Sequence, residues 1–159
     1  MEIFQGENES AIDSILNSSR AILSIAVKSL NVIEESISIA QYRILVILGG
    51  RGDLPMSEVA KETSLAPASA TRLCDDLFKK GLISRKPHEV DRRQVIVNIT
   101  EEGSEIIRKV TESRRRMISE VLSQLNDADL NEVEEGFALF SQSSPEPDET
   151  MLSTKFGWS

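Results

Sequence analysis

The chain has 159 residues, enough for one domain, or one domain with an extension, and a proper buried core. One cysteine and one histidine exclude an intrachain disulfide and a cysteine or histidine zinc cluster. No apolar run approaches the ~20 residues of a membrane span, and no secretory leader, phosphate loop or nucleophile elbow is visible. We therefore expect a cytoplasmic protein that is not an enzyme, with no cofactor, no metal and no membrane partner.

Residues 10–50 are predicted to form two helices. Ser10 and Asp13 have the spacing of a capping box, and apolar residues recur behind them at helical spacing for about five turns. Ile22, Ile25 and Ile33 widen this stripe beyond what packing on one side requires. The stripe can be an ordinary core face, but we prefer the interpretation that its additional apolar residues contact a second subunit. Ser38 and Gln41 form a better capping box, which opens a helix that runs through Leu48 and ends at Gly49-Gly50.

Residues 54–80 have the pattern of a helix-turn-helix. A short amphipathic helix is predicted over residues 56–63, a turn over 64–66, and a second helix from Pro67, which suits the first helical position. In the second helix Ala70, Leu73, Cys74 and Leu77 form one buried stripe, and Gly81 ends it. Its outer face then carries small, hydroxyl and guanidinium groups that can lie close to base edges and phosphates: Ala68, Ser69, Thr71 and Arg72.

Residues 82–99 are predicted to form a β-hairpin. The runs 82–86 and 94–99 are rich in β-branched residues, and Val95, Val97 and Ile99 alternate in the second. The loop between them, residues 87–93, carries Arg92 and Arg93 at its tip. A hairpin of this kind beside a helix-turn-helix is a wing, and an arginine at its tip can enter the narrow minor groove of DNA.

The net charge of −8 is unevenly distributed along the chain. Residues 1–53 carry 4 cations and 7 anions, residues 54–99 carry 8 and 6, and residues 100–159 carry 6 and 13. Only the central segment is basic. Because charges are screened over ~8 Å at physiological salt, the acidic remainder does not prevent a local contact with phosphates. It does predict weak non-specific affinity and marked salt sensitivity.

The last part of the chain is predicted to be two helices and a tail. Thr100 caps a long helix whose buried face is marked by apolar residues from Ile106 to Leu125, and Asn126 or Asp127 caps a helix with Leu130, Val133, Phe137 and Phe140 on its apolar face. Arg114, Arg115 and Arg116 point in different directions round the helix, so we expect solvated, intrachain-paired roles. Residues 144–159 are expected to be a flexible tail, in which Phe156 and Trp158 either dock on a partner subunit or move freely.

Several motifs together carry a family resemblance. The run T-R-L at residues 71–73 and L-x-K-K-G-L-I-x-R at 77–85 are followed by D-R-R at 91–93, an alternating strand and T-E-E-G at 100–103. In this order they resemble the MarR family of winged helix-turn-helix transcriptional regulators, most specifically over residues 65–103. The resemblance implies a mainly α fold with a small β-hairpin wing and a helical dimerisation layer. It also implies a homodimer, most often a repressor, that binds a pseudo-palindromic operator in double-stranded DNA.

We accordingly divide the chain into N-terminal helices at 10–50, a DNA-binding winged helix-turn-helix at 54–100, dimerisation helices at 101–143 and the tail. The predicted DNA-binding residues are Ala68, Ser69, Thr71, Arg72, Arg85, Asp91, Arg92 and Arg93. The resemblance places Arg92 in the minor groove, with Asp91 and Arg93 paired to hold the tip. The alternatives are a solvated helix face and an ordinary charged hairpin tip. Ala66 departs from the family, which normally has Ser or Thr capping this helix.

A ligand site and a redox site are two further possibilities, and each depends on only one or two residues. The resemblance implies a pocket between the DNA-binding unit and the dimerisation layer, where Tyr42 and Arg43 could meet a small anionic or aromatic effector. One Tyr and one Arg do not define a pocket, so we prefer that Tyr42 packs on the first helix and Arg43 is solvated or pairs with a carboxylate. Cys74 is interpreted as a core residue, with a redox-responsive thiol as the alternative. A winged-helix protein-interaction module without DNA binding is the other alternative function.

Overall fold

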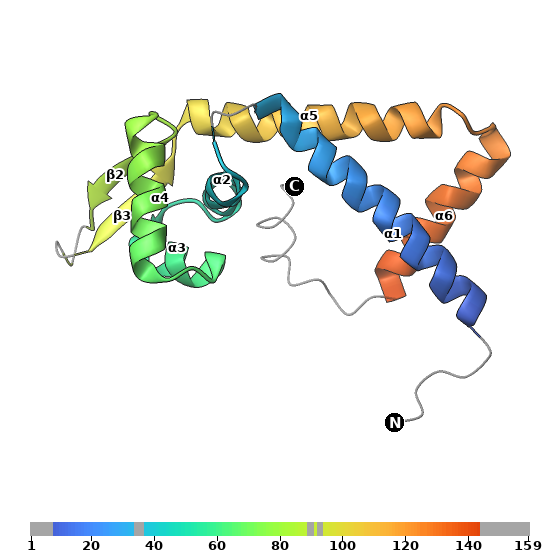
Figure 1. The fold of residues 1–159 in the computed structure, drawn as a ribbon, viewed down its shortest axis with the longest axis horizontal. Helices are drawn as coiled ribbons and strands as arrows, with labels where there is room; N and C mark the ends of the chain where they lie inside the picture. The colour runs from blue at the N-terminus through green and yellow to red at the C-terminus, as the bar shows by residue number, and fades with distance from the viewer. Residues whose placement is uncertain (1–7, 34–36, 89–90, 92–93, 144–159) are drawn as a thin grey trace, which may run out of the picture.

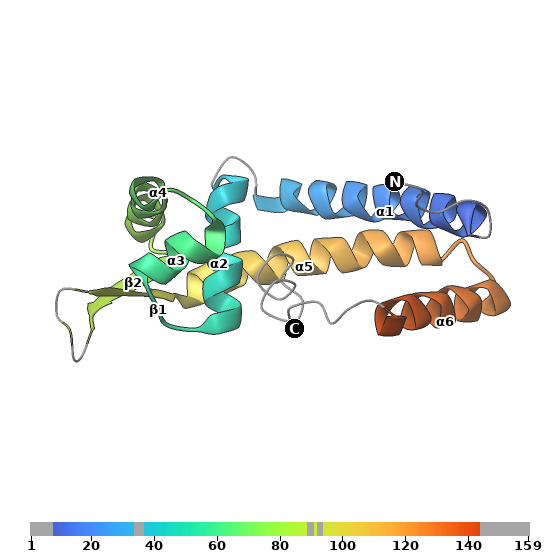
Figure 2. The same cartoon turned by 90° about the horizontal axis from the view of Figure 1, so that it is seen from below.

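The computed structural model of the chain describes residues 8–33, 37–88, 91 and 94–143. The molecule is elongated (Figures 1 and 2): α2, α3, α4 and a small sheet gather at one end, and α1, α5 and α6 extend to the other. The expected fold class, mainly α with a small β-hairpin wing, is confirmed. Within the described residues, no helix is both long and apolar enough to span a membrane.

The first helix, α1 (Glu9–Ser29), is followed by a 3-10 turn, η1 (Leu30–Ile33). The predicted capping box at Ser10 is wrong, because the helix already begins at Glu9 and Ser10 lies within its first turn. Asn8 is the N-cap, and its side chain makes no capping hydrogen bond.

The second helix, α2 (Ile39–Arg51), begins as predicted. The Ser38 hydroxyl accepts from the Gln41 backbone N–H at 3.2 Å, and the Gln41 side chain accepts from the Ser38 backbone N–H at 2.9 Å. The predicted end at Gly49-Gly50 is wrong, because the helix stops only at Gly52, which has φ +76°. Gly49 has a packing role instead: a Cβ there would lie 2.9 Å from Ile107 Cδ1.

The helix-turn-helix is formed as predicted by α3 (Met56–Thr63) and α4 (Pro67–Lys79), with Ser64 in the left-handed conformation between them. Pro67 occupies the first turn of α4, and Ala66 provides no side-chain cap. Ala70, Cys74 and Leu77 are fully buried, so the predicted stripe faces the core.

The sheet is antiparallel in the order β1-β3-β2, formed by β1 (Leu54–Pro55), β2 (Ile83–Pro87) and β3 (Val95–Ile99). The hairpin is confirmed, but the sequence analysis missed β1, since two residues ending in proline show no periodicity. The predicted alternation is wrong near the tip. Val95 is 42% exposed, whereas Ile96 is buried and pairs with both Pro55 and Lys86.

The core lies mainly where the sheet, α2, α3 and α4 meet. Its fully buried members are aliphatic residues and Cys74: Ile44, Leu45, Leu48, Val59, Cys74, Leu77 and Val97. A second cluster joins η1, α2 and α5 through Ile33, Tyr42, Val46 and Val110. This second cluster connects the end of the molecule that holds the helix-turn-helix to the long helices.

The long helices are α1, α5 (Glu101–Leu122) and α6 (Asp127–Ser143), and α5 lies between the other two in Figure 2. Asn126 caps α6 by accepting from the Asp129 backbone N–H at 3.0 Å. Apolar faces predicted to be buried are exposed in the single chain along α1, the far end of α5, and α6. The exposed residues include Leu16, Leu23, Val27, Ile118, Val121, Leu130, Phe137 and Phe140.

Candidate nucleic-acid interface

Helix α4 presents the face that the sequence predicted. The buried side of the helix fixes its rotation, so that Ala68, Thr71 and Arg72 are exposed and Ser69 is partly buried. The Thr71 hydroxyl donates to the Pro67 carbonyl at 2.9 Å. A hydroxyl has one donor, so Thr71 must rotate before it can donate to a phosphate. The Arg72 side chain makes no hydrogen bond or ion pair with the described residues, and it is the cation available on this face.

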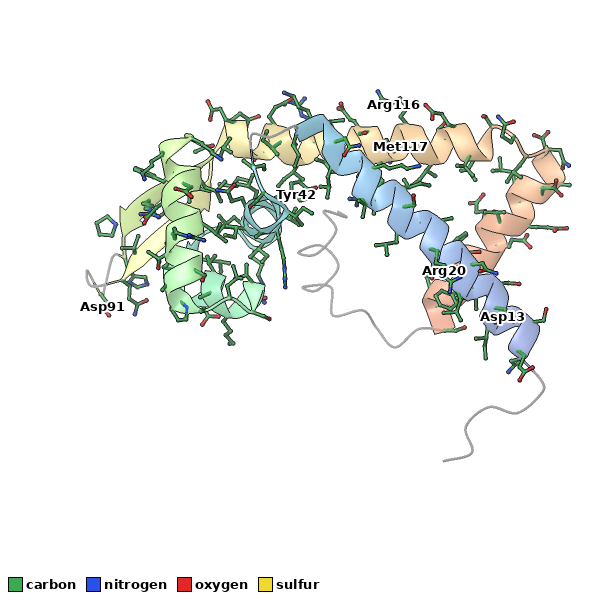
Figure 3. All side chains as sticks on the ribbon, in the orientation of Figure 1. Asp13, Arg20, Tyr42, Asp91, Arg116 and Met117 are labelled. Carbon is green, nitrogen blue, oxygen red and sulfur yellow. The ribbon has the colours of Figure 1, made fainter. Side chains whose placement is uncertain are left out.

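The hairpin between β2 and β3 stands beside α4 (Figure 1). At its tip, labelled by Asp91 in Figure 3, the Asp91 backbone N–H donates to His88 Nδ1 at 3.1 Å. Gln94 donates its side-chain amide to Asp91 Oδ2 at 3.2 Å and its backbone N–H to the Asp91 carbonyl at 2.9 Å. Asp91 therefore organises the tip through His88 and Gln94, two residues that the sequence analysis had not assigned. Arg92 and Arg93 lie outside the described residues, as does the expected Asp91–Arg93 pair.

Arg85 points from β2 toward α4 instead of toward the outer face of the hairpin. Its Nη1 lies 2.7 Å from Asp75 Oδ1, and its guanidinium carbon lies 5.3 Å from the centroid of the Phe78 ring. Its Nε and Nη2 atoms are buried and have no hydrogen-bond partner among the described residues. The structure thus brings Arg85 to Asp75 and Phe78, and not to the predicted DNA-contacting residues of α4, Ala68, Thr71 and Arg72. Asp75 and Phe78 have the i, i+3 spacing that places them on one face of α4, but only the fold reveals the strand opposite them.

The hairpin, the end of α4 and the start of α5 meet at Thr100. Its hydroxyl donates to the Gly81 carbonyl at 2.7 Å and accepts from the Gly103 backbone N–H at 3.1 Å. Its backbone N–H donates to the Leu82 carbonyl at 3.1 Å. Gly103 is buried against the same carbonyl, where an added Cβ would lie 2.2 Å from the oxygen. The T-E-E-G motif therefore fixes the end of α4 and the hairpin to the start of α5.

Tyr42 and Arg43 are not brought together. Tyr42 is buried between α2 and α5 (Figure 3), and its hydroxyl has no hydrogen-bond partner among the described residues. Burial raises the pKa of Tyr42, and the nearby Arg114 charge partly offsets this rise. Arg43 instead donates to the Glu62 carbonyl of α3 at 3.3 Å, while Arg51 pairs with the Glu62 carboxylate at 2.5 Å. The carboxylate pairing expected for Arg43 is therefore made by Arg51.

The three consecutive arginines of α5 have different environments. Arg115 and Arg116 are exposed, as predicted, and Arg116 lies on the outer edge of α5 in Figure 3. Arg114 is not solvated as expected, since it is only 9% exposed, but its expected intrachain pairing is confirmed: it donates through Nε to the Ser29 hydroxyl at 3.4 Å. Helical rotation by about 100° per residue turns this one arginine toward α1 and Tyr42. The spacing was visible in the sequence, but the position of α1 was not.

Cys74 has the environment of a core residue. Its side chain is fully buried, and burial raises the pKa of its thiol to about 11, with the Arg85 charge opposing this rise and Asp75 reinforcing it. A redox sensor needs an accessible thiol with a lowered pKa. The core interpretation is therefore confirmed by this burial, and the redox alternative loses its physical basis.

Comparison with known proteins agrees with this architecture. The model of the MarR family matches residues 37–95. An uncharacterized HTH-type transcriptional regulator of Bacillus subtilis, YhbI, is 33% identical over 129 residues, which are 78% of this chain and 84% of that protein. The HTH-type transcriptional repressor MdtR of the same organism is 29% identical over 97 residues, 61% of this chain and 63% of MdtR.

The crystal structure of RV1404 from Mycobacterium tuberculosis superposes with a TM-score of 0.76 at 28% identity, covering 92% of this chain and all of that one. The helix-turn-helix, the hairpin beside it and the flanking long helices thus occur together in a related solved structure. The chain belongs to the MarR family and is a DNA-binding transcriptional regulator.

Proposed function

We propose that the protein is a homodimeric repressor that binds a pseudo-palindromic operator. The observation that carries this proposal is the exposed face of α4, with Ala68, Thr71 and Arg72, standing beside the hairpin. In this arrangement α4 enters the major groove, where side chains can reach base edges, and Arg92 at the hairpin tip enters the adjacent minor groove. Ser69 and Arg93 complete the proposed contacts, while Asp91 shapes the tip.

The homodimer is supported by the apolar residues that the single chain leaves exposed. They occur on all three long helices, and Leu23, Val121 and Leu139 are each more than half exposed. So many large apolar side chains left exposed along three helices favour an interface with another chain. One DNA-binding unit reads about half a site, and a two-fold dimer places two units ~34–36 Å apart, one turn of duplex.

Repression is proposed because MdtR, a related protein, is named as a repressor. A dimer seated on two successive major grooves occupies the DNA that polymerase needs. The alternative of a protein-interaction module without DNA binding is set aside, since the family to which the chain belongs consists of transcriptional regulators.

Release by a small anionic aromatic effector is part of the proposal. Tyr42 on α2 and Ser113 on α5 carry buried hydroxyl groups that have no hydrogen-bond partner within the described part of the chain, and Arg114 adds a cation from α5. Arg43 takes no part, because it is engaged with α3. An effector bound here must have different affinities for the two spacings of the DNA-binding units, since only such a difference shifts their equilibrium.

The DNA contact is tested by a gel shift on the DNA upstream of the chain's own gene. Replacing Arg92 by Ala removes the minor-groove cation and is expected to weaken binding by about tenfold to a hundredfold. The matched control is Arg116→Ala, because Arg116 is exposed on the outer edge of α5. Equal affinity of the Arg92→Ala variant and the wild type would remove the hairpin from the mechanism.

A further inference from the structure

Arg85 is held in a slot that joins the hairpin to α4. One side of the slot is the Asp75 carboxylate, 2.7 Å from Arg85 Nη1, and the other is the ring of Phe78, 5.3 Å from the guanidinium carbon. The Arg85 side chain is 24% exposed, and its Nε and Nη2 atoms are shielded from solvent. A phosphate cannot reach those two nitrogen atoms unless the side chain leaves the slot.

The neighbouring residue is fixed on the other side of the strand. Lys86 forms an ion pair with Asp53, which precedes β1. Successive residues of a strand point to opposite faces, so Arg85 and Lys86 hold β2 from both sides. β2 leads directly into the tip of the hairpin. Its placement therefore sets where the tip lies relative to α4.

The partners of Arg85 are too exposed for the pair to serve mainly as a source of stability. Asp75 is 45% exposed and Phe78 is 49% exposed, and ion pairs in such positions contribute little to folding. Two elements that enter adjacent grooves at once must, however, be held at one relative position. The slot supplies that constraint at the base of the hairpin.

We infer that Arg85 is a positioning residue for DNA recognition: through Asp75 and Phe78 it fixes the hairpin relative to α4, and it does not bind phosphate. This inference rests on the proposed function, in which α4 and the hairpin contact DNA together. It replaces the direct DNA contact that the sequence analysis expected of Arg85. It also gives a role in DNA binding to Asp75, although the negative charge of this residue would by itself repel the DNA phosphates.

The variant Asp75→Asn distinguishes a positioning role of Asp75 from a purely electrostatic effect, because the two predict changes in DNA affinity of opposite sign. Removing an anion from α4 reduces repulsion of phosphate, so charge alone predicts equal or tighter binding. Loss of the slot predicts weaker binding, by about tenfold for a coupled pair in direct contact. The matched control is Asp76→Asn, which removes the same charge from the next position, where the described residues show no ion pair. The probe is a duplex that the wild-type chain selects from a random-sequence pool.

Arg85→Gln tests whether the guanidinium meets phosphate. Loss of one phosphate contact lowers the slope of log affinity against log salt by about 0.9, whereas loss of positioning weakens binding with that slope unchanged. Phe78→Leu removes the ring without changing any charge and is expected to weaken binding in the same way. Thermal unfolding of each variant verifies that the protein is folded at the assay temperature.

The inference is supported if Asp75→Asn, Arg85→Gln and Phe78→Leu all weaken binding at a constant salt slope while Asp76→Asn does not. It is overturned if Asp75→Asn behaves like Asp76→Asn, or if Arg85→Gln lowers the slope by about one unit. A wild-type chain that selects no duplex overturns the proposed function, and this inference with it. These outcomes therefore distinguish failure of the inference about Arg85 from failure of the proposed function.

Discussion

At the scale of single residues, burial decides which reactive groups can act. Cys74 follows the exposed Thr71 and Arg72 closely in the sequence, yet the rotation of α4 turns it into the core. With a pKa of about 11 its thiol is protonated at neutral pH. Because the folded pKa lies above the unfolded value of 9.0, the protonated thiol contributes stability that is present below pH 9 and is lost as pH rises toward about 11.

We predict that Cys74 resists Ellman's reagent in the native protein at pH 8 and reacts at once when the chain is unfolded in guanidinium chloride. Thiolate is the species that reacts. In the folded protein, burial keeps the Cys74 thiol protonated at this pH and keeps the reagent away from its sulfur atom. A double variant, Cys74→Ala with Ser123→Cys, provides an exposed thiol at the end of α5 as the control. Rapid reaction of native Cys74 would restore the redox alternative.

At the scale of elements, the junction around Thr100 determines how the hairpin meets α5. The T-E-E-G motif could be predicted to cap a helix from its sequence alone, and Thr100 does so. Its second bond, to the Gly81 carbonyl, depends on the end of α4 lying beside the start of α5, which no local pattern specifies. The close approach of Gly103 to Leu82 has the same origin.

Replacing Gly103 by Ala should destabilise the protein by about 1–3 kcal/mol, because the obstructing Leu82 carbonyl is backbone and cannot rotate away. Thermal or denaturant unfolding measures the change. Gly136→Ala is the control: apart from the backbone of α6 itself, no described residue comes within 4 Å of an added Cβ there, and Ala is the better helix former by about 0.5–1 kcal/mol. Opposite signs are therefore expected for the two substitutions, and a Gly103→Ala variant as stable as the wild type would contradict the packing argument.

At the scale of the whole molecule, local patterns predicted most elements but not their mutual contacts. Helical spacing located α3 and α4, and capping residues located the starts of α2 and α5. The start of α1 and the end of α2 were misplaced, and the strand β1 was not predicted, since β1 exists through its pairing with the distant strand β3. Among site residues, the exposed face of α4 followed from periodicity. The positions of Arg85 and Arg114 did not, because their partners are far away in sequence.

The exposed apolar faces of the long helices lead to the last prediction. Leu16 and Leu23 are seven residues apart, so they lie on the same side of α1, and both are at least half exposed in the single chain. If a second copy covers them, replacing both by Glu places uncompensated charges in the interface and should convert the dimer to a monomer of 17.6 kDa. Light scattering coupled to size exclusion measures the mass, and circular dichroism verifies that the helices remain.

Operator binding should weaken in the same variant, since a monomer contacts only one half-site. The control is Ala21→Glu, which adds a charge at an exposed position on the opposite side of α1 from Leu23 and should leave both mass and binding unchanged. If the double variant stays dimeric, the interface lies on other helices. If the wild type is itself a monomer that binds DNA tightly, two linked half-sites are not required, and the proposed pseudo-palindromic operator is wrong.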